Sequence, residues 1–144
     1  MHIEKLDGPS FKKMFIGGAS LLSAKKNEIN DLNVFPVPDG DTGTNMILTI
    51  KSAVQELEKV ADKSTDTLAK SISIGSLMGA RGNSGVILSQ LFRGFAKGVE
   101  GKSKLSGIDF AKALQEGVNS AYNAVLKPVE GTMLTVAKET AKTA

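Results

Sequence analysis

The sequence predicts an all-α fold, an antiparallel helical bundle, and three observations lead to this prediction. Apolar residues recur at three- and four-residue spacing through almost the whole chain. No segment shows convincing period-two alternation between turn signals, so strands are not expected. The connections between the periodic segments are mostly short, as between neighbouring antiparallel helices. With 144 residues and 41% hydrophobic content, the chain is long enough to bury a core as one domain.

The first two predicted helices have clear apolar stripes. The first covers residues 11–22, and Pro9 suits its opening turn directly after Asp7. The second covers residues 46–60, where apolar side chains follow a four-three-four-three spacing. This spacing places them on one face of a helix, toward a core.

The third predicted helix covers residues 68–75, with Ser64 or Thr65 as its N-cap. The fourth carries its apolar stripe over residues 88–99.

The last two predicted helices lie in the C-terminal part. Ser106 and Asp109 resemble a capping box in which Asp replaces the usual Glu. From there an apolar face continues over residues 108–125 and stops before Pro128. A sixth helix is predicted to begin near residues 131–132. The sequence thus predicts about six helices.

The composition excludes several classes of function. There is no cysteine, so neither disulfides nor thiolate metal sites are available. A net charge of +3, scattered lysines, no Trp and one Tyr argue against a nucleic-acid partner. No stretch approaches the length of about eighteen apolar residues that a membrane span requires. The N-terminus also lacks an apolar signal region. These features predict a cytoplasmic protein.

A loop before the second helix carries two crowded carboxylates. Asp39 and Asp41 are separated only by Gly40, and Pro36 and Pro38 precede them. Carboxylates this close repel each other unless a cation neutralises them. Hard oxygen ligands of this kind suit Mg²⁺, whose coordination is often completed by substrate phosphates. The prolines fix the backbone, so that the ligands can be set before a metal arrives.

The second helix is predicted to begin directly after this loop, at Thr44 or Asn45. Its free N–H groups and its dipole would then point at the same place, which suits phosphate oxygens. The alternative is that Asp41 or Thr44 simply caps the helix while Asp39 is a solvated turn residue. Spacing alone leaves both interpretations open.

A second loop, residues 79–85, holds three glycines in seven residues. Its exposed N–H groups, the Ser84 hydroxyl and the Arg81 guanidinium could hold phosphate oxygens. The alternative is a plain helix–helix turn, in which Asn83 or Ser84 caps a helix that begins near these residues. In a bundle this loop and the acidic loop could lie at the same end.

Two long motifs, residues 33–46 and 78–90, closely resemble the N-terminal domain of the kinase component of bacterial fatty acid kinases. That domain belongs to the nucleotide-binding, L-type (DAK2) family of dihydroxyacetone kinases. The resemblance covers essentially the whole chain, residues 1–144, and implies a barrel-like bundle of eight antiparallel helices. Since only about six helices fit, it implies a C-terminally incomplete kinase domain without the later partner-binding domains.

The resemblance also implies that ATP or ADP and two Mg²⁺ are held by the loops at one end of the bundle. Asp39 and Asp41 match metal-bridging aspartates, and Asn33 corresponds to a further metal ligand, with Asp31 as the alternative. Thr42 stands where dihydroxyacetone kinases have a histidine, which favours the fatty acid kinase branch over a glycerone substrate. The nucleotide-binding positions implied are Thr42, Thr44, Asn45, Gly82, Asn83, Ser84, Thr132 and Met133.

The implied reaction is ATP-dependent phosphorylation of a fatty acid, which gives an acyl phosphate. A separate, DegV-like fatty-acid-binding protein would carry the acceptor. No general base is required from this chain, because a carboxylate is already nucleophilic at neutral pH. The competing hypotheses are a phosphotransfer subunit that holds ADP as a cofactor, a nucleotide-sensing domain without catalysis, and a helical interaction module without a ligand. A bundle with missing helices would also expose apolar surface, which a second copy could cover in a homodimer.

Overall fold

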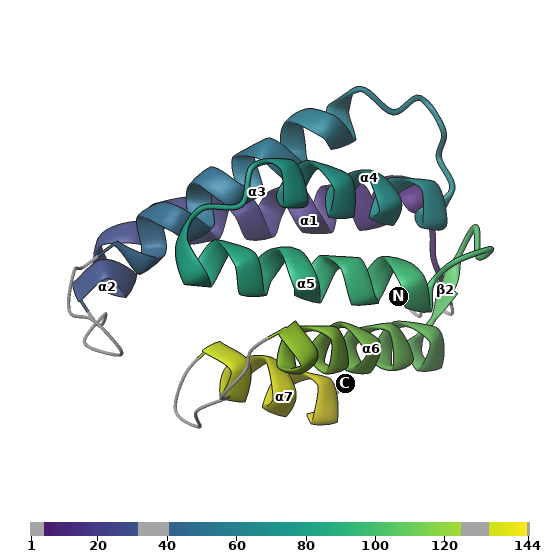
Figure 1. Ribbon diagram of the computed structural model, residues 1–144. Coiled ribbons are helices and arrows are strands. Elements are labelled where there is room, and N and C mark those ends of the chain that lie inside the picture. The colour runs from purple at the N-terminus through teal and green to yellow at the C-terminus, as the bar shows by residue number, and fades with distance from the viewer. Residues whose placement is uncertain (1–4, 32–40, 125–132, 144) are drawn as a thin grey trace.

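The computed structural model describes residues 5–31, 41–124 and 133–143. Within these ranges the chain forms helices and one pair of two-residue strands, so the predicted all-α fold is confirmed (Figure 1). In chain order the elements are β1 (Lys5–Leu6), α1 (Gly8–Ala24), α2 (Lys26–Asp31), α3 (Thr42–Glu58), α4 (Thr65–Met78), α5 (Gly82–Gly98), β2 (Leu105–Ser106), α6 (Gly107–Ala124) and α7 (Met133–Thr143).

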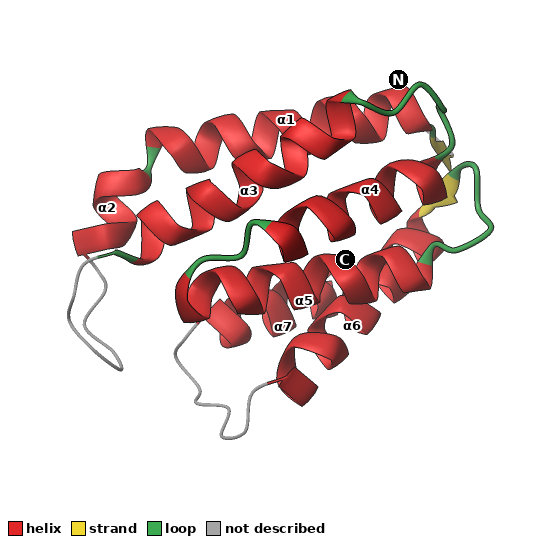
Figure 2. Cartoon of the chain, turned by 45° about the horizontal axis from the view of Figure 1, so that its top comes forward, coloured by secondary structure: helices red, strands yellow, loops and turns green. Residues whose placement is uncertain are grey.

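The long helices run back and forth along one direction. Helix α3 packs against α1, α4 and α5, while α5 also packs against α6, and α6 against α7. The starts of α3, α5 and α7 lie at one end of the bundle, together with α2 (Figures 1 and 2). The strand pair lies at the opposite end (Figure 1). The fold therefore gathers several helix N-termini at one end.

The core is apolar and partly aromatic. Phe11 of α1 stacks on Phe95 of α5 with ring centroids 5.7 Å apart, and Phe110 of α6 meets Phe95 edge-on at 5.4 Å. Leu57 and Leu68 join α3 and α4 to this cluster and are 0% and 2% exposed. Phe11, Leu57, Leu68 and Phe95 come from the apolar stripes predicted for four helices. Phe110 was not part of the stripe predicted for the fifth helix, whose first member, Ile108, is 69% exposed. Burial of their side chains supplies most of the driving force that holds the bundle together.

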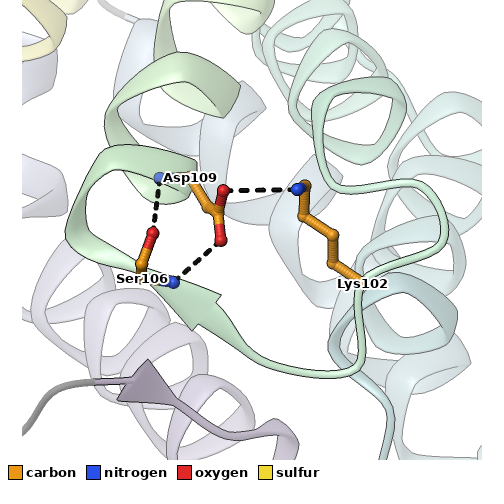
Figure 3. A network of polar contacts seen from close by, with 3 residues as sticks. All are labelled: Lys102, Ser106 and Asp109. Atoms are coloured by element: carbon orange, nitrogen blue, oxygen red, sulfur yellow. Dashed lines mark hydrogen bonds and ion pairs between the residues drawn. The ribbon is translucent and has the colours of Figure 1, made fainter.

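Local hydrogen bonds cap two helix starts, of which the one at α6 was predicted. Asp7 is the N-cap of α1 and accepts a hydrogen bond from the Ser10 N–H at 2.8 Å. In α6, the Ser106 N–H donates to Asp109 Oδ2 at 3.0 Å, and the Asp109 N–H donates to Ser106 Oγ at 3.1 Å (Figure 3). The predicted capping box is confirmed. Lys102 adds an ion pair to Asp109 Oδ1 at 3.3 Å (Figure 3).

The structure differs from the prediction in several details. The short helix α2 was not expected, because its six residues are too few to show a periodic stripe. Strands β1 and β2 pair antiparallel, Leu6 opposite Leu105, and two residues are likewise too short to show alternation. Helix α3 begins at Thr42 and α5 at Gly82, one to three residues before the predicted starts. Between the two N-caps proposed for α4, the structure selects Ser64.

Among the described residues, none of the helices combines the length and the apolar character that a membrane span requires.

Candidate functional site

The two motifs found in the sequence meet at one end of the bundle. Helices α3 and α5 both begin there (Figure 1), and the Ser84 hydroxyl donates to the Thr42 carbonyl oxygen at 3.4 Å. The positive ends of two helix dipoles therefore lie side by side. Two adjacent helix N-termini concentrate backbone N–H donors at one place, which suits an anionic ligand such as a phosphate group.

Asn30 of α2 holds the first turn of α3. Its Oδ1 accepts a hydrogen bond from the Thr44 N–H at 3.2 Å, and its Nδ2 donates to Thr44 Oγ1 at 3.0 Å. Asn30 thus serves as a capping residue supplied by a neighbouring helix. Because Thr44 Oγ1 acts as an acceptor here, the hydroxyl hydrogen is left to donate to a different acceptor, and a phosphate oxygen would suit it.

Asp41 occupies the N-cap position of α3, with φ −115° and ψ 5°, but its side chain makes no capping hydrogen bond. Asp41 therefore lies at the N-cap position, as the capped-turn interpretation required, but its side chain does not form the capping hydrogen bond. Thr44 lies inside the first turn rather than at the cap. The Asp41 carboxylate is exposed at the same end of the bundle as the start of α5. A carboxylate placed there can serve as a cation ligand next to bound phosphates.

The glycine loop turns back on itself at the start of α5. Gly82 has a φ of +65°, in the left-handed region that favours glycine. A Cβ at this position would also come within 2.5 Å of Asn45 Nδ2. Arg81 is the N-cap of α5, so neither Asn83 nor Ser84 caps this helix as the turn interpretation required. Gly82 therefore allows the backbone of the second loop to touch α3.

The predicted site residues fall into two groups. Those that the structure places at this end of the bundle are Asp41, Thr42, Thr44, Asn45, Gly82, Asn83 and Ser84. Asp31, the alternative metal ligand, is the exposed last residue of α2 at the same end. Met133 is the first residue of α7, which also begins there (Figure 2). Those that lie outside the described residues are Asn33, Asp39 and Thr132.

Two residues of this region, Asn30 and Thr49, were not predicted from the sequence. Asn30 lies in a helix that the apolar pattern could not reveal. Thr49 interrupts the apolar pattern of α3 and is 0% exposed. A buried hydroxyl needs hydrogen-bond partners. The available signal in the sequence was that Thr49 follows Asn45 by four residues, which places both on one face of a helix.

The side chains that the structure describes supply few ligands for an Mg²⁺ ion. No group of three or more His, Cys, Asp or Glu residues suitable for a metal ion is found among them. Asp41 supplies one carboxylate, whereas Asp39 and Asn33 fall outside the described residues. Within the described part of the chain, the predicted Mg²⁺ ligands are therefore represented by Asp41 alone or with Asp31, and an Mg²⁺ site stays a prediction.

Comparison with known proteins assigns the family. Residues 36–144 match the DAK2 domain, a span that contains both loops. This chain belongs to the DAK2 domain family. DAK2 domains are related to dihydroxyacetone kinases and in general bind ADP or ATP. The end of this DAK2 domain at which α3 and α5 begin is therefore the candidate nucleotide site.

Bacterial relatives are similar in sequence to this chain over all or nearly all of its residues. Protein YloV of Bacillus subtilis is 55% identical over 144 residues, which is all of this chain and 26% of the relative. An uncharacterized protein of Staphylococcus epidermidis is 56% identical over 142 residues, again 26% of its length. An uncharacterized protein of Staphylococcus aureus is 54% identical over 142 residues. The chain thus spans about a quarter of the length of these relatives.

Proposed function

We propose that this DAK2 domain binds Mg-ATP at the end of the bundle where α3 and α5 begin, and that it acts as an ATP-dependent kinase domain. The acceptor would be a fatty acid carried by a separate, DegV-like acyl-binding protein, and the product an acyl phosphate. The observation that carries the proposal is the hydrogen bond from the Ser84 hydroxyl to the Thr42 carbonyl oxygen. It joins two motifs that are 42 residues apart, and this supports the proposal because N–H donors from both helix starts could then reach one anion.

The residues of this chain would chiefly bind and orient the nucleotide. N–H groups in the first turns of α3 and α5 would donate to phosphate oxygens, aided by the aligned dipoles. The Thr44 hydroxyl, held by Asn30, would donate to another phosphate oxygen. Arg81 is exposed within the glycine loop and would add a cationic donor. Phosphoryl transfer depends mainly on such positioning and charge stabilisation.

Asp41 and Asp39, with Asn33 or Asp31 as a further ligand, would hold two Mg²⁺ ions. The ions would neutralise charge on the phosphate oxygens. An oxygen of the fatty acid carboxylate would attack the γ-phosphorus, and the bond to the β,γ-bridging oxygen would break, releasing ADP. Because the attacking carboxylate carries no proton at neutral pH, no residue of this chain has to remove one.

The test uses the full chain with a fatty-acid-loaded partner and γ-labelled ATP. We expect label on the acyl acceptor with wild type, and loss of transfer in Asp39→Ala and in Asp41→Ala without unfolding. Glu58→Ala is the matched control, because Glu58 is an exposed carboxylate at the other end of α3. Calorimetric titration with Mg-ATP measures binding separately from transfer.

Each contrary result points to a different explanation. Full transfer in both aspartate variants would refute the assigned metal ligands. Mg-ATP binding without transfer would indicate a nucleotide-sensing domain. Label that exchanges only between bound ADP and a phosphodonor protein would indicate a phosphotransfer subunit that keeps ADP as its cofactor. Absence of binding would favour a helical interaction module.

A further inference from the structure

A strip of polar residues on α3 faces the glycine loop. Asn45, Thr49 and Ser52 follow one another at four- and three-residue spacing, which places them on one face of the helix. Each of the three loop glycines approaches this strip so closely that a Cβ would meet an α3 side chain: Gly79 at 2.3 Å from Ser52 Cβ, Gly82 at 2.5 Å from Asn45 Nδ2, and Gly85 at 2.4 Å from Thr49 Oγ1.

These contacts describe the path of the loop. From Gly79 the backbone runs along α3 toward the helix start, and it reverses at Gly82, where φ is +65°. Helix α5 then runs back beside α3, so that Gly85 returns to the level of Thr49. The loop thus lies directly against α3.

Thr49 makes the directional bonds of this strip. Its hydroxyl donates to the Asn45 carbonyl oxygen at 2.8 Å and accepts a hydrogen bond from the Arg81 N–H at 3.2 Å. The side chain is 0% exposed, so water does not compete for these bonds. One hydroxyl therefore ties the backbone at the start of α5 to the first turn of α3.

We propose that Thr49 is a positioning residue for nucleotide binding. Its buried hydroxyl holds the glycine loop against α3, so that the N-termini of α3 and α5 face one phosphate-binding space. The inference rests on the proposed function, because it is the nucleotide whose binding the alignment serves. Thr49 itself is buried and acts through Arg81 and the loop that follows it, not by touching the nucleotide.

The test compares Thr49→Val with Thr49→Ser in the full chain. Valine has nearly the same shape but cannot accept the Arg81 N–H, whereas serine keeps the hydroxyl. We expect Mg-ATP to bind about tenfold more weakly to Thr49→Val, since the Arg81 N–H loses the acceptor that holds the loop against α3. Thr49→Ser should stay within about threefold of wild type on the same reasoning. Hydrogen exchange at the Arg81 amide should be faster in Thr49→Val and unchanged in Thr49→Ser.

Thr65→Val is the matched control. Thr65 is also 0% exposed, and its hydroxyl donates to the Ser103 carbonyl oxygen at 2.6 Å. It lies at the start of α4, whose 14 residues extend over about 21 Å and end at the glycine loop. Thr65→Val should lower the thermal midpoint yet leave the affinity for Mg-ATP unchanged.

The outcomes separate this inference from the proposed function. Equal Mg-ATP affinity in wild type and Thr49→Val would overturn the positioning role, as would an equal loss of affinity in Thr65→Val. A wild-type chain that binds no Mg-ATP would refute the proposed function instead. The exchange rate at Arg81 would then still decide whether Thr49 docks the loop on α3.

Discussion

Replacing Gly82 with alanine tests whether the contact between the glycine loop and the first turn of α3 controls ligand binding. The change adds one methyl group at a residue with a φ of +65°. The new Cβ would come within 2.5 Å of Asn45 Nδ2 and 3.1 Å of Asn45 Cγ. The Asn45 side chain must therefore move, or the start of α5 must withdraw from α3.

The expected loss of folding free energy in Gly82→Ala has two parts. The left-handed conformation costs an L-residue about 1–2 kcal/mol of folding free energy relative to glycine. Displacement of the Asn45 amide adds roughly 1 kcal/mol, typical for a lost close contact at a partly buried polar group. For a domain of this size each kcal/mol lowers the melting temperature by about 3–4 °C. Gly82→Ala should therefore melt about 6–12 °C below wild type.

Gly101→Ala is the matched control. Gly101 has a φ of +81°, but no atom lies within 4 Å of a Cβ built there. Gly101→Ala should therefore lose only the conformational part of the stability, and its melting temperature should fall by about 3–8 °C. Calorimetric melting gives the stability, and titration with Mg-ATP at a temperature where both variants are folded gives the affinity. Only Gly82→Ala should bind Mg-ATP more weakly, because only Gly82 touches the first turn of α3.

Two results would refute this reasoning. Equal melting temperatures for the two variants would show that Asn45 yields without cost. Unchanged Mg-ATP affinity in Gly82→Ala, with the expected loss of stability, would show that the contact between Gly82 and Asn45 is structural only.

Two further predictions concern stability. Asn30→Ala should lower the free energy of unfolding by about 1 kcal/mol, as loss of a helix cap does, and should weaken Mg-ATP binding. Asn30→Asp should retain most of the stability, because its carboxylate still accepts the Thr44 N–H. Equal urea midpoints for wild type and both variants would contradict this. Acid should also destabilise the fold. Hydrogen bonds lower the pKa of three carboxyl groups below 3.8, chiefly the Ser10 N–H for Asp7, the Ser64 hydroxyl for Asp66 and the Ser106 N–H for Asp109. Because the folded pKa values are depressed, their stabilisation is present above about pH 4 and is lost as pH falls through them. The urea midpoint, measured from pH 6 to pH 2, should decrease once the pH is below about 4, and it should decrease less steeply in Asp66→Asn. A midpoint that does not change with pH would contradict the assignment.

Much of the fold could be predicted from the sequence, because its helices are long and amphipathic. The stripe of apolar side chains over residues 88–99 indicated the helix that became α5. The capping box of Ser106 and Asp109 was also readable, since its two hydrogen bonds are local and involve residues three apart. Local chemistry of this kind is independent of the rest of the fold, and for that reason it could be predicted.

The remaining features depend on contacts between distant segments. Helix α2 has six residues and is held to α3 by Asn30, which is 14 residues from Thr44. Thr49 and Arg81 are 32 residues apart. A single sequence shows the residue types at such positions but not which of them meet. The ligand-binding roles of the predicted site residues all stay predictions, and Asp39, Asn33 and Thr132 also lie outside the described ranges.

The contacts that align the candidate site are distinct from those that hold the bundle together. Leu57, Leu68 and Phe95 pack in an apolar core, whereas Thr49, Asn30 and Ser84 join the site segments through a few hydrogen bonds. A core of this kind carries most of the folding free energy, while each hydrogen bond contributes only about 1 kcal/mol. Loss of one such bond should therefore leave the bundle folded but shift a helix N-terminus relative to its neighbour. Anion binding needs donors from both helices at one place, so ligand affinity should respond to these bonds more strongly than stability does.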